Sequence, residues 1–193
     1  MEVFMRKLVI VGLCVLVVGI AQAQDLKKLG TGDFGLSASI SSSTDTVGFA
    51  WHLASRVVLM PEVGFYTWNH AITATTGSST TNYSGYWIHG ALSIYFEANP
   101  FGNLYLDIGP QVYYSIQPSY RVDGSTDNYT WSDMGAQVNV SPKLLLTNNL
   151  AVFTVLGFQY YFNDKKDTTT GYEYAASGFA LVNPNLGIIY YFR

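Results

Sequence analysis

The sequence predicts an all-β chain that folds as an eight-stranded antiparallel up-and-down transmembrane β-barrel. Three observations support this class. Apolar residues alternate with small or polar residues at a period of two in eight segments. Charged residues make up only 12% of the chain, about half the usual share in a soluble domain. After the first strand, short and long connections alternate, which is the asymmetry of membrane-spanning β-barrels.

The first 23 residues have the layout of a secretory signal peptide. Arg6 and Lys7 form a basic start, an apolar run follows at residues 8–20, and Ala21-Gln22-Ala23 resembles a cleavage site. The alternative is a retained membrane anchor, but a spanning helix needs about 20 apolar residues. We therefore expect a signal peptide at 1–23, cleavage after Ala23, and a barrel domain at 24–193.

Cysteine and charge narrow the class of protein further. Cys14 is the only cysteine, and it would leave with the signal peptide, so we expect neither a disulfide framework nor a cysteine metal site. Leu13 stands directly before it, whereas lipoprotein processing requires a small residue there. Residues 24–193 carry eight basic and twelve acidic side chains, a balance that predicts no nucleic-acid partner.

The first three strands are expected at 32–42, 46–53 and 57–68. A short turn at 54–56 joins the second strand to the third as a hairpin, and a long polar loop is expected at 69–83. One face of these strands is apolar. Its members are Phe34, Leu36, Ala38, Ile40, Val47, Phe49, Trp51, Leu53, Leu59, Pro61, Val63 and Phe65.

The fourth and fifth strands are expected at 85–96 and 104–116, with a turn at 97–103 between them. Their apolar face again alternates with a smaller and more polar face. That second face comprises Trp87, His89, Ala91, Ser93, Tyr95, Tyr105, Asp107, Gly109, Gln111, Tyr113 and Ser115.

The last three strands are expected at 129–146, 150–161 and 179–192. Long loops at 117–127 and 163–178 and a tight turn at 147–149 connect them. The seventh strand is apolar on both faces in its first half, so its register depends on Gly157 and Gln159, which indicate the polar side.

Alternation alone does not separate a membrane barrel from a soluble barrel or sandwich whose apolar face forms a core. The less apolar face is built mainly from Gly, Ser, Asn and Gln, with isolated charges at Glu62, Asp107 and Asp133, whereas a soluble surface carries many Lys and Glu. Aromatic residues also gather near both ends of the strands, as in the two interfacial girdles of membrane barrels. These features favour a barrel whose apolar face meets lipid.

Four prolines test this register. Pro61, Pro110, Pro142 and Pro184 all fall on the predicted outer face. Since proline removes one hydrogen bond from a strand ladder, we expect a local β-bulge at each.

The segments "LASRVVLMPEVGFY", "SPKLLLTNNLAVFTVLGF" and "NPNLGIIYYF", together with "AQAQ" at the cleavage site, resemble small outer-membrane β-barrels of the OmpA/OmpX type. The resemblance is to the porin-like outer-membrane β-barrel domain common in Bacteroidetes. It implies a place in the cell outer membrane of a Gram-negative envelope, contact with outer-membrane lipid, and recognition by the barrel-assembly machinery. The assembly signal would be the final strand with Leu186, Ile188, Tyr190 and Phe192, although Arg193 follows the terminal aromatic.

The polar residues of the inner face are expected to form a lumenal network in which buried charges are paired. Its candidate members are Glu62, His89, Asp107, Asp133 and Lys143. A catalytic alternative would use His89 as the base and Ser93 as the nucleophile, but lipid of the outer leaflet lies outside the lumen.

No pattern in the sequence predicts a metal site or a cofactor. The acidic residues Asp164, Asp167 and Glu173 lack the spacing of a calcium loop. We expect a non-enzymatic, monomeric outer-membrane barrel with a structural, adhesive or narrow-pore role and a lumen filled by side chains. The alternatives are a barrel enzyme acting on lipid A and a soluble periplasmic barrel that binds a ligand.

Overall fold

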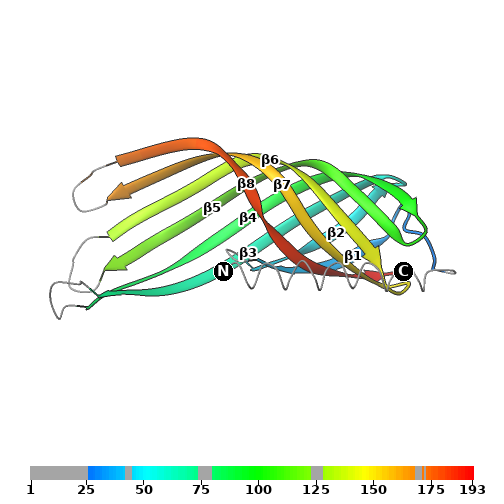
Figure 1. The fold of residues 1–193 in the computed structure, drawn as a ribbon, viewed down its shortest axis with the longest axis horizontal. Helices are drawn as coiled ribbons and strands as arrows, with labels where there is room; N and C mark the ends of the chain where they lie inside the picture. The colour runs from blue at the N-terminus through cyan, green and yellow to red at the C-terminus, as the bar shows by residue number, and fades with distance from the viewer. Residues whose placement is uncertain (1–25, 42–44, 74–79, 123–127, 168–170, 172) are drawn as a thin grey trace.

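The computed structural model describes residues 26–41, 45–73, 80–122, 128–167, 171 and 173–193. They form one closed barrel of eight antiparallel strands, each paired with its neighbours in sequence order (Figure 1). The predicted fold class is therefore confirmed. The strands are β1 (Phe34–Ile40), β2 (Asp45–Ala54), β3 (Val57–Thr73), β4 (Thr80–Phe101), β5 (Leu104–Val122), β6 (Asn128–Leu145), β7 (Leu150–Asp167) and β8 (Glu173–Phe192). The predicted signal peptide lies outside the described residues.

The barrel is closed by β1 against β8. Their register runs from Phe34 opposite Phe192 to Ile40 opposite Leu186. We call the end of the barrel at Phe34 and Phe192 the closed end, and the opposite end, where β3, β5 and β7 finish, the hairpin end. Among the described residues, no helix has the length and apolar character needed to cross a membrane.

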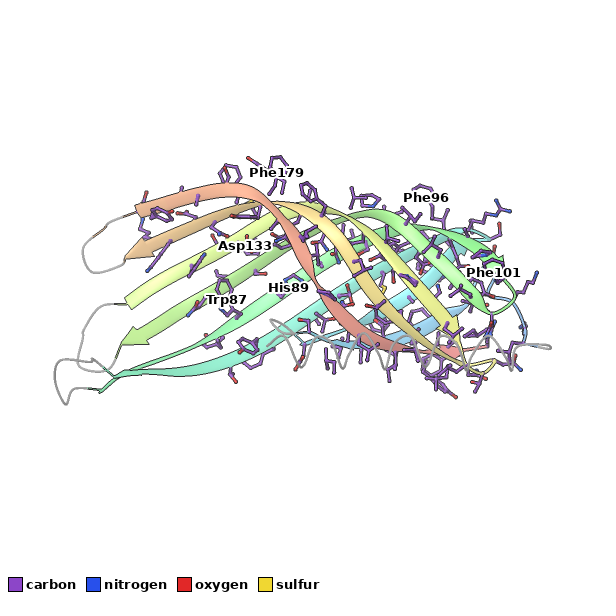
Figure 2. All side chains as sticks on the ribbon, in the orientation of Figure 1. Trp87, His89, Phe96, Phe101, Asp133 and Phe179 are labelled. Carbon is purple, nitrogen blue, oxygen red and sulfur yellow. The ribbon has the colours of Figure 1, made fainter. Side chains whose placement is uncertain are left out.

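The apolar face of the strands points outward, as predicted. Large apolar side chains are exposed on every strand, and Phe96, Phe101 and Phe179 project from the surface in Figure 2. On β7, Leu156, Phe158 and Tyr160 face outward, which confirms that Gly157 and Gln159 mark the inner face. The most buried large side chains belong to the inner face near the closed end; they include Tyr95, Tyr105, Tyr191, Lys143 and His52.

The long polar loops were predicted too long. β3 continues to Thr73 and β4 begins at Thr80, so most of the expected loop at 69–83 is strand. β5 to Val122 and β8 from Glu173 likewise replace much of the other two loops. These segments are rich in Thr, Ser and Tyr, and their polarity led to the prediction of loops. Such residues are accepted in a strand, and Thr and Tyr favour one, when a neighbouring strand is available for pairing.

The prediction of bulges at the prolines holds at one position. Between the pairs Val155 with Asn185 and Gly157 with Val182, β8 contains one residue more than β7, so a bulge lies at Pro184. Regular pairing of β7 with β8 is thus interrupted at this proline and resumes at Asn185.

The prediction is wrong at Pro61, Pro110 and Pro142. In each case the ladder on one side skips the proline and resumes in the same register, while the ladder on the other side is continuous. A strand alternates its hydrogen-bonding groups between its two neighbours, so a proline on a given strand costs pairing on one side only. An extra residue is therefore not required.

Candidate functional site

The lumen near the closed end contains a buried ionic cluster centred on Lys143 of β6. Its Nζ lies 2.6 Å from Glu97 Oε2 and 3.0 Å from Asp107 Oδ2, and His52 Nε2 lies 3.2 Å from the same Glu97 oxygen. All four side chains are at most 7% exposed. The Tyr105 ring lies beside the ammonium group, with its centroid 5.5 Å away. Since an isolated buried charge is very unfavourable, mutual pairing is what allows these groups to be inside the barrel.

A second polar group lies further along the lumen around Glu62 of β3. Thr46 and Gln111 each donate a hydrogen bond of 3.2 Å to its carboxylate. Gln111 in turn accepts hydrogen bonds from Gln137 and from Asn139, the latter at 3.1 Å. This belt of side chains connects β2, β3, β5 and β6 across the interior.

A third group lies toward the hairpin end. His89 Nδ1 and Ser115 Oγ are joined by a hydrogen bond of 2.7 Å, and the His89 ring lies 5.8 Å from the Tyr113 ring. The Tyr113 hydroxyl donates to Asp133 at 3.4 Å. His89 thus bonds Ser115 of β5, whereas Ser93 is fully buried on β4. This geometry is different from the His89 and Ser93 pair of the catalytic alternative.

The five candidate network residues are therefore distributed over three groups. Asp107 and Lys143 meet in an ion pair, while Glu62, His89 and Asp133 bond to neutral partners. Sequence reasoning missed Glu97, because it was assigned to a turn. The alternation of Ser93, Tyr95 and Glu97 could have identified it, since all three are buried on the inner face of β4.

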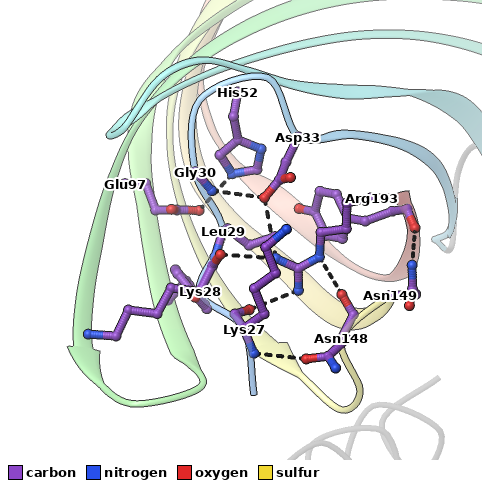
Figure 3. Close-up of polar contacts among 12 residues, drawn as sticks. Lys27, Lys28, Leu29, Gly30, Asp33, His52, Glu97, Asn148, Asn149 and Arg193 are labelled. Carbon is purple, nitrogen blue, oxygen red and sulfur yellow. Dashed lines mark hydrogen bonds and ion pairs between the residues drawn. The ribbon is translucent and has the colours of Figure 1, made fainter. Parts of the chain in front are cut away.

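A segment before β1 crosses the closed end and is held there by Arg193. The guanidinium group donates to the carbonyls of Lys27 at 2.9 Å and Lys28 at 3.0 Å, and it lies 3.3 Å from the Asp33 carboxylate (Figure 3). It also donates to the Asn148 carbonyl in the β6–β7 turn. Arg193, which follows the terminal aromatic residue, thus holds this segment in place. We call the segment the strap (residues 26–33).

The strap also contacts the core directly. Leu29 is 7% exposed and belongs to the buried cluster, and its backbone N–H donates to the Tyr105 hydroxyl at 3.0 Å. Lys27 N–H donates to the Asn148 side chain at 2.8 Å. The strap and the Lys143 cluster therefore share Tyr105 as a common contact and fill the closed end together.

The lumen at the hairpin end is less tightly filled and is lined by aromatic residues. Trp87 of β4 and Trp131 of β6 meet edge to face with ring centroids 5.5 Å apart. Gln117 of β5, between these strands, is 2% exposed. Most other described inner-face side chains at this level, including His89, Asp133 and Tyr161, are only partly buried.

Further toward the hairpin end than this layer, charged side chains lie on the surface of the protein. Lys166 of β7 donates a hydrogen bond of 2.7 Å to Glu173 of β8, and both side chains are more than half exposed. That bond lowers the pKa of Glu173 and raises the pKa of Lys166. In the described part of the chain, no cluster of three or more His, Cys, Asp or Glu side chains could hold a metal ion.

Comparison with known proteins gives structural likeness only. No family model and no curated protein sequence matches the chain. A major outer membrane protein from Thermus thermophilus is similar, with a TM-score of 0.53 and 15% identity over 83% of this chain and 99% of that one. This chain has the fold of an outer-membrane barrel.

Two solved structures from Acinetobacter baumannii are also similar. CarO2 is 11% identical, covering 83% of this chain and 99% of its own length, with a TM-score of 0.41. CarO is 12% identical, covering 82% and 97%, with a TM-score of 0.38.

Proposed function

We propose that the chain is an integral outer-membrane protein of the small, OmpA/OmpX-like type. The observation that carries the proposal is the outward apolar surface: Leu181 is 79% exposed, Phe179 69% and Val138 59%. Polar side chains occupy the interior instead. Contiguous exposed apolar surface on this scale is unfavourable in water and is the lipid-facing pattern of membrane barrels.

We further propose a structural or adhesive role rather than general diffusion. The interior of an eight-stranded barrel is just wide enough for side chains, and here the closed end is filled by the Lys143 cluster, three tyrosines and the strap. The hairpins at the other end extend as polar strands, and they would be the surface available to the exterior. Leu186, Ile188, Tyr190 and Phe192 all lie on the outer side of β8, consistent with an assembly signal read by the barrel-assembly machinery.

The first test is refolding of residues 24–193 with and without detergent or lipid vesicles. Unheated samples are compared with boiled samples by gel electrophoresis. We expect a species of altered mobility that forms only with detergent or lipid and disappears on boiling. Equal folding in plain buffer would overturn the membrane assignment and support a soluble barrel.

The second test separates a plugged barrel from a narrow pore. The refolded protein is inserted into a planar lipid bilayer, and ionic current is recorded beside an empty bilayer. We expect no discrete conductance steps from the wild type, because the closed end is filled. Regular steps of one size would contradict the structural role and favour the pore.

We also propose that the barrel is not an enzyme. The support is that the base and the nucleophile of the enzymatic alternative, His89 and Ser93, are not paired: His89 Nδ1 is bonded to Ser115, and the Ser93 side chain is buried without a bond to His89. The mass spectrum of lipid A from cells producing the wild type or His89→Ala should be the same. A modification present with the wild type and lost with the variant would establish the enzymatic alternative.

A further inference from the structure

Three cations at the closed end have no counter-ion among the residues that the structure describes. They are Lys27 and Lys28 of the strap and Arg56 of the β2–β3 turn, and all three are exposed. The ion pairs of the described residues use other cations, namely His52, Lys143, Lys166 and Arg193. The charge of the three exposed cations is therefore directed toward the surroundings of the protein.

Acidic groups do not offset this charge at the closed end. Those of the described closed end are already paired with Arg193 or Lys143; they are Asp33, Glu97 and Asp107. The exposed acidic residues of the described structure lie toward the hairpin end; they are Asp45, Asp164 and Glu173. Asp25 precedes the strap and lies outside the described residues, and its single charge would still leave the closed end positive.

Two of the cations approach the hairpin that joins β4 to β5. The Arg56 carbonyl accepts a hydrogen bond of 2.9 Å from the Glu97 N–H, so the β2–β3 turn lies beside the end of β4. The Leu29 N–H donates to the Tyr105 hydroxyl at 3.0 Å, which places the strap beside the start of β5. Figure 3 shows the Lys28 side chain extending from the strap over this hairpin. Two different elements thus bring a cation to the same hairpin.

The β4–β5 hairpin also carries an exposed aromatic side chain. Phe101 is 69% exposed and projects at the closed end in Figure 2. The Asn99 side chain donates to the Gly102 carbonyl at 2.8 Å, and this bond closes the turn that contains Phe101. Phe96, which is 61% exposed on the outer face of β4, continues the apolar surface away from the turn. The two cations therefore lie where the apolar surface of the barrel ends.

This combination of side chains fits the headgroup region of a membrane leaflet. Aromatic side chains concentrate at the boundary between hydrocarbon and water. Lys and Arg side chains near an anionic leaflet are attracted to its lipid headgroups. A soluble polyanion such as a glycan strand would contact the cations but would leave Phe96 and Phe101 exposed. The continuity with the apolar surface therefore favours a lipid.

We propose that the closed end binds the headgroup of an anionic phospholipid, with Lys28 and Arg56 contacting its phosphate and Phe101 lying among its upper acyl carbons. The inference rests on the proposed outer-membrane function, in which the closed end faces the periplasmic leaflet. Anionic lipid is then preferred over zwitterionic lipid beside the β4–β5 hairpin. An anionic glycan is the competing occupant of the same cations.

The test uses a fluorescent dye on a single introduced cysteine, since residues 24–193 contain none. Ala98→Cys places the dye at the exposed end of β4, and Ala136→Cys places it on the exposed outer face of β6, further toward the hairpin end. Each protein is refolded in phosphatidylcholine vesicles that contain a small fraction of phosphatidylglycerol or phosphatidylcholine carrying a nitroxide on one acyl chain. Because nitroxide quenches the dye on close approach, titrating this fraction gives the relative association of the two lipids.

We expect phosphatidylglycerol to be preferred at position 98 and not at position 136. One cation near an anionic headgroup changes association about fivefold, so Lys28→Gln and Arg56→Gln should each lower the preference by that factor. The double variant K28Q/R56Q should abolish it.

Two matched controls carry the same change of charge elsewhere. Lys27→Gln lies beside the β6–β7 turn, where the Lys27 N–H donates to Asn148, and Lys166→Gln lies at the hairpin end. Neither should alter the preference at position 98 by more than about twofold, because the attraction is strongest at the hairpin that the lipid contacts. Each variant is first shown to have the heat-sensitive mobility of the folded barrel.

The outcomes separate this inference from the membrane assignment. Absence of quenching by either lipid at both positions would mean that the barrel is not inserted, and both proposals would fail. Equal quenching by the two lipids at position 98 would overturn the lipid site and leave the membrane barrel intact. A preference that survives K28Q/R56Q, or that Lys27→Gln removes to the same extent, would also overturn the site. Loss of the preference on addition of soluble peptidoglycan fragments would identify a glycan as the occupant instead.

Discussion

At the scale of single residues, Lys143 neutralises two carboxylates that the barrel has removed from water. Glu97 and Asp107 lie 2.6 Å and 3.0 Å from its ammonium group and have almost no exposed surface. Replacing Lys143 by an apolar residue leaves the two buried carboxylates without a counter-ion. This costs more free energy than replacing the whole cluster by apolar residues. The cluster is therefore more sensitive to the loss of one member than to the loss of all.

We expect Lys143→Met to lower the free energy of unfolding by about 3–5 kcal/mol, because Glu97 and Asp107 lose their counter-ion. Urea titration in lipid vesicles, followed by tryptophan fluorescence, measures the change. Lys166→Met, which removes an exposed ion pair, should leave the unfolding midpoint unchanged. The triple variant K143M/E97Q/D107N should recover much of the loss; failure to do so would point to packing rather than charge.

Arg193 gives a second prediction at this scale. Arg193→Ala removes hydrogen bonds to the strap, and the loss of about 1.5 kcal/mol from one charge-assisted bond would raise the detached population about tenfold. Trypsin in detergent solution should then cut after Lys27 and Lys28 faster than in the wild type, with the rate read by mass spectrometry. Arg56→Ala, at an exposed turn, is the control. Equal cleavage of all three proteins would mean that Arg193 does not hold the strap.

At the scale of the strands, close backbone approach limits which side chains are allowed. A Cβ at Gly109 of β5 would overlap the Ile94 carbonyl of β4, next to the place where the ladder skips Pro110. At Gly90 of β4 a Cβ would meet nothing within 4 Å. Packing therefore requires a glycine at position 109 but not at position 90.

Gly109→Ala should consequently destabilise the barrel by about 1–3 kcal/mol, the usual cost of forcing an atom into a packed site. Gly90→Ala should be neutral or slightly stabilising, because alanine loses less entropy than glycine on folding. Denaturant titration of both variants in vesicles compares them directly. A loss at Gly90 equal to that at Gly109 would exclude the steric explanation.

The faces of the strands could be predicted from the sequence, but several of their ends could not. Period-two alternation placed Phe49, Val63 and Leu92 outside because each side of a strand faces one environment. Thr73 and Thr80 are polar, so the hydropathy pattern stops before them, whereas backbone pairing continues. The sequence also could not predict that strand pairing is skipped beside Pro61 without a bulge, since it does not show which neighbouring strand each backbone N–H faces.

At the scale of the whole molecule, the outer surface distinguishes a membrane barrel from a soluble one. Val138→Lys places a charge in the middle of the outer face and should cost about 2–4 kcal/mol in vesicles. Leu146→Lys, just beyond β6 at the closed end, should cost about 0–1 kcal/mol, because the penalty falls near the interface. Unfolding titrations of both variants test this. Equal, negligible effects would argue that water and not lipid surrounds Val138.

The candidate site could be predicted as a set of lumenal polar residues but not as three separate groups. Glu62 and Lys143 both point into the lumen. Because the strands are staggered around the barrel, two residues that point into the lumen can lie at different heights along the barrel axis. Gln111, which is central to the Glu62 group, is neutral and gave no charge signal. The strap was not foreseen, because its contacts with Arg193 join residues more than 160 positions apart.

The pairing of β1 with β8 has a consequence for the lifetime of the folded state. This ladder spans only the seven residues of β1, whereas β3 and β4 pair from Val57 to Thr73. Arg193 of the chain end and Asp33 before β1 lie on opposite sides of the short ladder and are joined by an ion pair. Separation of β1 from β8 is thus the expected first step of unfolding, and because the strap contacts break in that step, the strap would stabilise the folded state mainly by slowing unfolding and not by speeding refolding.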